Sequence, residues 1–125
     1  MKALLTPMLL CAAMGAAHAA PAQDQTAGLA GEYDLWEDFE GGRVCALTLT
    51  DEPTIGGDAA EGDEACIAQL GLDGDIFAWF TAEDGQLVLA DAMRHVLVRF
   101  NLTGEGDYYA IRAEAGLENL VLSPR

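Results

Sequence analysis

The sequence is poor in the residues from which hydrolytic and nucleic-acid-binding sites are usually built. Its one lysine is Lys2, and its two histidines are His18 and His95, which leaves few ways to assemble a Ser-His-Asp set or a lysine nucleophile. From residue 20 onward, five arginines stand against 21 acidic residues, which gives a net charge of −16. A domain this acidic repels nucleic acid and anionic membrane surfaces. We therefore expect no enzymatic activity, no nucleic acid partner and no membrane partner.

Long apolar runs are also scarce. The longest, residues 3–17, is shorter than the roughly 20 residues that cross a bilayer, and it lies between Lys2 and a small-x-small sequence at 17–19. A positive end, an apolar stretch and a small-residue cleavage sequence are typical of a secretory signal peptide. We expect residues 1–19 to be removed and the protein to be periplasmic or secreted. A leucine precedes Cys11 where a lipoprotein signal has a small residue, so lipid attachment is the less favoured alternative.

Cysteine is rare as well, and only Cys45 and Cys66 remain once the signal peptide is removed. Exported compartments are oxidising, so we expect these two cysteines to form a disulfide. With both cysteines bridged and one histidine left, a zinc site is disfavoured, and we expect no cofactor. The acidic segment 51–64 offers oxygen ligands around Gly62 but does not follow the EF-hand order. We interpret it as a solvated loop, with calcium binding as the alternative.

From Leu29 onward, short alternating apolar runs are separated by glycines and acidic residues, a pattern typical of all-β proteins. The Glu-Asp-Gly sequence at 83–85 predicts a tight hairpin turn, and residues 65–70 predict a single helical turn. Regular short turns favour an antiparallel up-and-down barrel over a small sandwich, because a closed barrel has no exposed sheet edges. We expect seven or eight strands, at 31–36, 44–50, 76–81, 86–90, 94–102, 108–113 and 117–122, with a short one near 54–55.

Residues 20–28 are small or polar and offer little to bury, so they predict an N-terminal arm outside a barrel domain of residues 29–125. His95 alternates with Val96 and Val98, which we expect to share the inward face with Phe100; His95 should then face solvent. The aromatic residues allow two interpretations, a ligand cavity or core filling, and core filling is favoured in a barrel this small. They are Trp36, Phe39, Phe77, Trp79, Phe80 and Phe100.

Several short motifs, taken in order and spacing, are similar to those of one known family. They are Leu29-Ala30-Gly31-Glu32-Tyr33-Asp34-Leu35, Cys45-Ala46-Leu47-Thr48-Leu49, Cys66 with Leu70, Trp79, Asp84-Gly85-Gln86-Leu87-Val88-Leu89, Phe100, Tyr108-Tyr109, Leu120-Val121-Leu122 and Arg125. The sequence resembles the bacterial alkaline-protease inhibitors, which inhibit serralysin-type zinc metalloproteases and have outer-membrane lipoprotein relatives. Tyr33 departs from the family pattern, which has tryptophan at that position.

The resemblance implies an eight-stranded antiparallel barrel, a disulfide between Cys45 and Cys66, and an inhibitor of a secreted zinc metalloprotease. We expect the protein to be a monomer. The resemblance also implies that the arm enters the protease cleft with its terminal amine at the catalytic zinc. The protease-binding residues would be Ala20, Pro21, Ala22, Gln23 and Asp24. A freed α-amine has a pKa of about 8, so enough of it is neutral to donate a lone pair to zinc and displace the attacking water. The alternatives are inhibition of other protease classes, a small-ligand-binding barrel, and a structural envelope protein.

Overall fold

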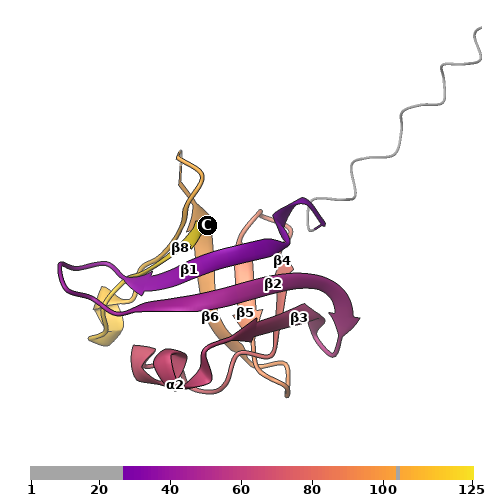
Figure 1. The fold of residues 1–125 in the computed structure, drawn as a ribbon, viewed down its shortest axis with the longest axis horizontal. Helices are drawn as coiled ribbons and strands as arrows, with labels where there is room; N and C mark the ends of the chain where they lie inside the picture. Colours follow the sequence, from indigo (N-terminus) through magenta and orange to yellow (C-terminus); the bar gives the residue numbers. More distant parts are fainter. Residues whose placement is uncertain (1–26, 104) are drawn as a thin grey trace, which may run out of the picture.

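The computed structural model describes residues 27–103 and 105–125, which form a closed all-β barrel (Figure 1). The strands are β1 (Gly31–Glu37), β2 (Val44–Thr54), β3 (Gly57–Gly62), β4 (Ala78–Thr81), β5 (Leu87–Ala90), β6 (Val96–Leu102), β7 (Tyr108–Ala110) and β8 (Leu120–Pro124). Each strand pairs antiparallel with the next in sequence, and β1 also pairs with β8. The predicted eight-stranded antiparallel up-and-down barrel is therefore confirmed, and the alternative of a small sandwich was wrong.

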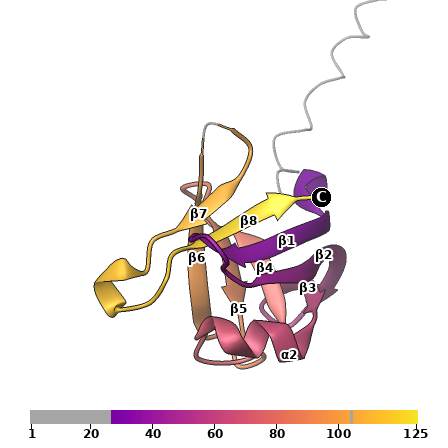
Figure 2. The ribbon, with the colours of Figure 1, turned by 60° about the vertical axis from the view of Figure 1, so that its left-hand side comes forward.

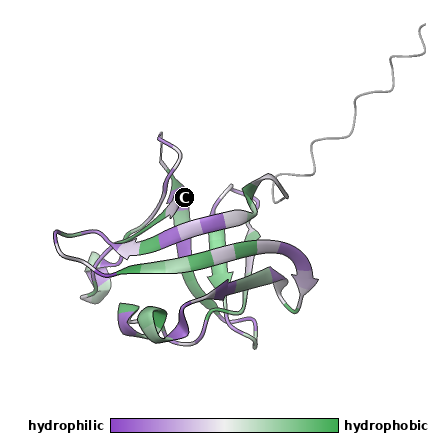
Figure 3. Ribbon diagram, in the orientation of Figure 1, coloured by the Kyte–Doolittle hydropathy of each residue, from purple (hydrophilic) through white to green (hydrophobic). Residues whose placement is uncertain are grey.

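The interior of the barrel is filled by apolar side chains from alternate strand positions. Tyr33 and Leu35 point inward from β1, and the banding of apolar and polar residues along β1 and β2 is visible in Figure 3. The largest fully buried side chains are Trp79, Phe100, Leu35, Leu47, Leu49, Leu70, Leu87, Leu89, Leu120 and Leu122. Burial of one such side chain stabilises the fold by about 1.5–3 kcal/mol. Trp79 and Phe100 thus fill the core, whereas Phe39 and Phe77 are exposed.

The acidic segment 51–64 forms a hairpin rather than the predicted loop. β2 continues to Thr54, the chain turns at 55–56, and β3 follows at once. Pro53 is accommodated because the register between β2 and β3 shifts between Leu49 and Pro53, and proline in a sheet is confined to such irregular or edge positions. The prediction was wrong because acidic side chains on the solvent face of two strands look, in sequence, like a solvated loop.

The prediction for Val96 was also wrong. Val98 and Phe100 are buried as expected, but Val96 is 43% exposed. The register between β5 and β6 shifts at this point, since Leu89 pairs with Val98 whereas Ala90 pairs with Val96. An extra residue in one strand reverses the side-chain alternation beyond it, and this irregularity leaves no clear signal in the sequence.

A short helix, α2 (Glu64–Ile67), continues into the 3-10 turn η4 (Ala68–Leu70) and confirms the helical turn predicted at 65–70. The Asp63 carboxylate accepts a hydrogen bond from the Cys66 backbone N–H at 3.2 Å and caps α2. Ile67 and Leu70 are buried in the barrel core. Figure 2 shows α2 at one end of the barrel, away from the start of β1. In the described residues no helix is long and apolar enough to cross a membrane.

The predicted disulfide is present. Cys45 in β2 and Cys66 in α2 are joined by a 2.01 Å S–S bond across a separation of 21 residues. The bond ties the first residues of β2 to the helix that carries the buried Ile67, so it holds this end of the barrel closed.

We expect replacement of both cysteines by alanine to lower the free energy of unfolding by about 3 kcal/mol, because the cross-link removes loop entropy from the unfolded chain. Urea unfolding of the oxidised protein, the reduced protein and the double variant measures this. The reduced protein and the variant should unfold at similar, lower urea concentrations. Equal midpoints for the oxidised and reduced proteins would show that the bond contributes nothing.

Candidate functional site

The five residues predicted to bind a protease, Ala20, Pro21, Ala22, Gln23 and Asp24, lie outside the described residues, as do the predicted signal peptide and most of the arm. The described chain starts with the 3-10 turn η3 (Ala27–Leu29), which leads directly into β1. We call residues 27–30 the arm root. The candidate site is therefore the end of the barrel where the arm root joins β1.

The arm root is fixed to the barrel by the side chain of Tyr33. The Tyr33 hydroxyl donates a hydrogen bond of 2.5 Å to the carbonyl of Leu29, four residues earlier in the chain. Leu29 and Ala30 are partly buried and pack against the core. Between them and Tyr33, Gly31 has φ 153°, a backbone conformation that residues with a Cβ rarely adopt. The chain thus bends at Gly31 so that the arm root lies over a side chain of β1.

A second set of contacts holds the other side of the same strand. The backbone N–H of Arg125 donates to the carbonyl of Glu32 at 2.9 Å. The Arg125 guanidinium Nε donates to the Asp34 carboxylate at 2.8 Å. Both side chains of this ion pair are partly exposed, so its own contribution to stability is small. Together these contacts extend the pairing of β8 with β1 to the residues beside the arm root.

A surface recess of about 480 Å³ lies next to the arm root. It is lined in part by Tyr33, Leu102, Gly106, Tyr108 and Arg125. Burial raises the pKa of the Tyr33 hydroxyl, and Tyr108 nearby raises it further. Burial likewise raises the pKa of Tyr108. Both hydroxyls therefore keep their protons, and Tyr33 remains a hydrogen-bond donor, well into the alkaline range.

The turns on this side of the barrel are acidic. Figures 1 and 2 show the turns between β4 and β5 and between β6 and β7 projecting on the same side as η3. The first contains Glu83 and Asp84, and the second contains Glu105 and Asp107. The first turn is the predicted hairpin, with Gly85 at φ 91°. The barrel surface around the arm root is accordingly negative.

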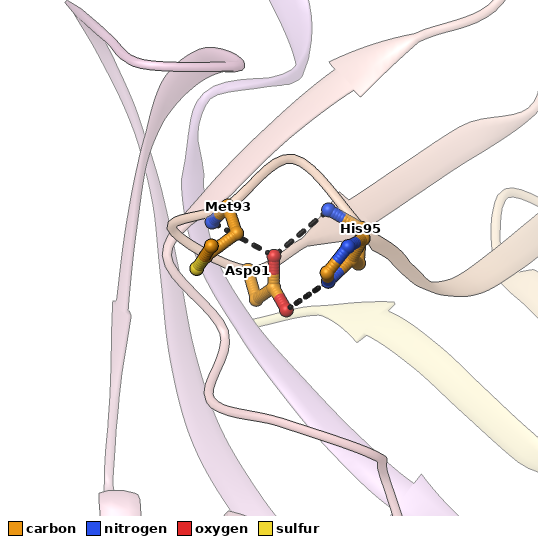
Figure 4. A network of polar contacts seen from close by, with 3 residues as sticks. All are labelled: Asp91, Met93 and His95. Carbon is orange, nitrogen blue, oxygen red and sulfur yellow. Dashed lines mark hydrogen bonds and ion pairs between the residues drawn. The ribbon is translucent and has the colours of Figure 1, made fainter.

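His95 and Asp91 form a polar network in the turn between β5 and β6 (Figure 4). The His95 side chain is 73% exposed, as predicted, and its Nδ1 lies 3.3 Å from Asp91 Oδ2. The same carboxylate accepts hydrogen bonds from the backbone N–H groups of His95 and Met93, at 2.8 and 2.9 Å. Arg94, between them, has φ 69°. These contacts hold a strained turn in place, and they account for the pair without a catalytic role.

The acidic residues in the described part of the chain do not converge on a metal site. Among residues 27–103 and 105–125, no three His, Cys, Asp or Glu side chains lie close enough together to hold a metal ion. In the segment considered for calcium, Asp58 and Glu61 belong to β3, and the Asp63 carboxylate caps α2. The segment 51–64 is thus built from parts of β2 and β3 and from the start of α2.

Sequence reasoning did not identify Tyr33 and Arg125 as residues that fix the arm root. Both belong to the motifs that carry the family resemblance, and Tyr33 stands where the family pattern has tryptophan. The Tyr33 hydroxyl reaches the Leu29 carbonyl, four residues earlier in the chain, because the chain bends at Gly31. That bend has no unique sequence pattern, because glycine is also common in turns and loops.

Comparisons with known proteins agree with the fold. A family model described as protease inhibitor Inh matches residues 23–123. A solved structure, the crystal structure of a psychrophilic marine protease MP inhibitor, is similar with a TM-score of 0.62 and 21% sequence identity. That similarity covers 79% of this chain and 97% of the other, and at this identity it establishes a shared fold. No match was found among the curated proteins.

We expect the carboxyl group of Asp91 to titrate below its ordinary pKa of 3.8 in the folded protein, because the backbone N–H of His95 stabilises the charged form. The resulting stabilisation is present above the pKa of the unfolded chain and is lost as the pH falls through the lowered folded value. An NMR pH titration of this carboxyl group tests the expectation. The H95A variant keeps the backbone bond, so its Asp91 should still titrate below 3.8. A midpoint at or above 3.8 in the native protein contradicts this account.

Proposed function

The chain belongs to the protease inhibitor Inh family, and from this premise we propose that it inhibits a secreted zinc metalloprotease of the serralysin type. A protease partner follows from membership of the family. The serralysin-type target rests on the sequence resemblance over residues 29–125. We further propose that the protein acts as a monomer without enzymatic activity of its own.

In the proposed mechanism the arm, residues 20–28, enters the active-site cleft of the protease. The α-amine of Ala20 takes the coordination position on the protease zinc where the attacking water would bind. Residues 21–24 lie along the primed subsites. An α-amine with a pKa of about 8 has a substantial neutral fraction near pH 8, and the neutral form donates its lone pair to zinc. Without a metal-bound water the protease has no nucleophile.

The observation that carries this proposal is the way the arm root joins the barrel. Leu29 is held by the Tyr33 hydroxyl and packs on the core, so the arm starts from a fixed point on a rigid body. A preorganised support lowers the entropy lost on binding. The family match begins at residue 23, inside the proposed arm, which supports a role for this segment beyond linking the signal peptide to the barrel.

The proposed location is the periplasm or the extracellular medium, after removal of residues 1–19. The disulfide between Cys45 and Cys66 supports it, because such bonds persist in oxidising compartments. A ligand-binding barrel is the weaker candidate, since large side chains such as Trp79 and Phe100 occupy the interior. Lipocalin-like binding needs that space to be open.

We expect the exported protein to begin at Ala20. The small-x-small sequence at 17–19 directs signal peptidase to the bond before Ala20. The intact mass of protein recovered from the periplasm or medium measures the position. A mass for an acylated chain that begins at Cys11 would instead assign the protein to the lipoprotein relatives.

Inhibition should depend on the free end of the arm. We expect deletion of residues 20–24 to abolish inhibition of a serralysin-type protease while the thermal midpoint stays nearly unchanged, because these residues precede the folded barrel. One extra residue before Ala20 should weaken inhibition at least tenfold, because it moves the amine away from zinc. The measurement is the inhibition constant of each form against the same protease with a fluorogenic peptide.

The matched control is a change of equal size at the opposite end of the molecule, insertion of one residue in the turn at 38–43. It should leave the inhibition constant within about twofold. If the native, truncated and extended proteins inhibit equally, the arm is not the inhibitory element and the proposed mechanism is wrong.

A further inference from the structure

The contact between Tyr33 and Leu29 has a geometry that core packing does not require. Tyr33 faces the barrel interior from β1 and is 5% exposed, yet its hydroxyl reaches the arm root, outside the strand. A phenylalanine ring would fill the same volume without this hydrogen bond. The hydroxyl therefore adds one thing to the barrel, a fixed position for the Leu29 carbonyl.

The strand that carries Tyr33 is itself held on both sides, so it is a firm anchor. Tyr33 pairs with Leu47 of β2 and with Pro124 of β8. Arg125 binds the carbonyl of Glu32 and the carboxylate of Asp34 on either side of it. Movement at the junction is then confined to the arm root. Gly31 itself is the first residue of β1 and pairs with Leu49 of β2.

We propose that the Tyr33 hydroxyl is a positioning group for inhibition, which fixes Leu29 at the point on the barrel from which the proposed arm starts. This role rests on the proposed function. Without the hydroxyl, the Leu29 carbonyl loses its donor and the arm root gains backbone freedom that binding to the protease must remove. The entropy cost of fixing the backbone of one residue on binding corresponds to about a tenfold loss of affinity. The contacts between the bound arm and the protease are unchanged in Y33F. We therefore expect the loss of affinity to appear as a slower association rate.

The test compares Y33F with Y108F in the exported protein. Tyr108 lies in the same recess, is 6% exposed, and pairs with β6 and β8 rather than with the arm root. Three quantities are measured for each variant: the association and dissociation rates with a serralysin-type zinc protease, the amide hydrogen exchange of Ala30 and Gly31, and the thermal midpoint.

Y33F should associate about tenfold more slowly, with a dissociation rate within twofold of the native value and faster exchange at the arm root. Y108F should match the native protein in association and in arm-root exchange. The positioning role is wrong if Y33F associates at the native rate, or if the association rate falls equally in both variants. The proposed function still stands in that case, provided that the native protein inhibits the protease. A native protein that inhibits no protease overturns the proposed function. The exchange data test the contact separately from inhibition. If Ala30 and Gly31 exchange at the same rate in Y33F as in the native protein, the Tyr33 hydroxyl does not hold the arm root.

Discussion

The pairing of β1 with β8, from Tyr33 with Pro124 to Glu37 with Leu120, converts a row of eight antiparallel strands into a closed barrel. Closure removes both sheet edges, which would otherwise be open to pairing with other chains. It also surrounds the apolar face of every strand, so that side chains such as Trp79 and Phe100 are fully buried. The same pairing brings residue 125 beside the strand from which the arm departs, although the two lie at opposite ends of the described chain.

This arrangement explains how a small domain of the protease inhibitor Inh family can present a binding segment from a rigid support. The barrel supplies rigidity, with a disulfide at the α2 end and the hydrogen bonds of Tyr33 and Arg125 at the arm end. A segment that emerges from such a body has less conformational entropy to lose when a partner binds it. The acidic turns around the arm root add a negative surface, which influences the rate at which a charged partner approaches.

The sequence patterns identified the elements whose signals are local. The Asp-Gly turn at 84–85, the helical turn at 65–70 and the cysteine pairing were all predicted correctly. The hairpin at 51–64 was missed because its acidic, solvent-facing side chains resemble those of a solvated loop. The orientation of Val96 was missed because it depends on a register shift that only the neighbouring strand imposes. The partner of the Tyr33 hydroxyl was likewise hidden, since it depends on how the chain bends at Gly31. Protease binding by residues 20–24 remains a prediction.

The most direct measurement of the central claim is a crystal structure of the exported protein bound to a serralysin-type protease. The account predicts residues 20–24 extended in the active-site cleft, with the α-nitrogen of Ala20 at about 2.1 Å from zinc in place of water. It also predicts that the Leu29 carbonyl still accepts the hydrogen bond from Tyr33. A complex in which the arm lies outside the cleft, or in which zinc keeps its water, would contradict it.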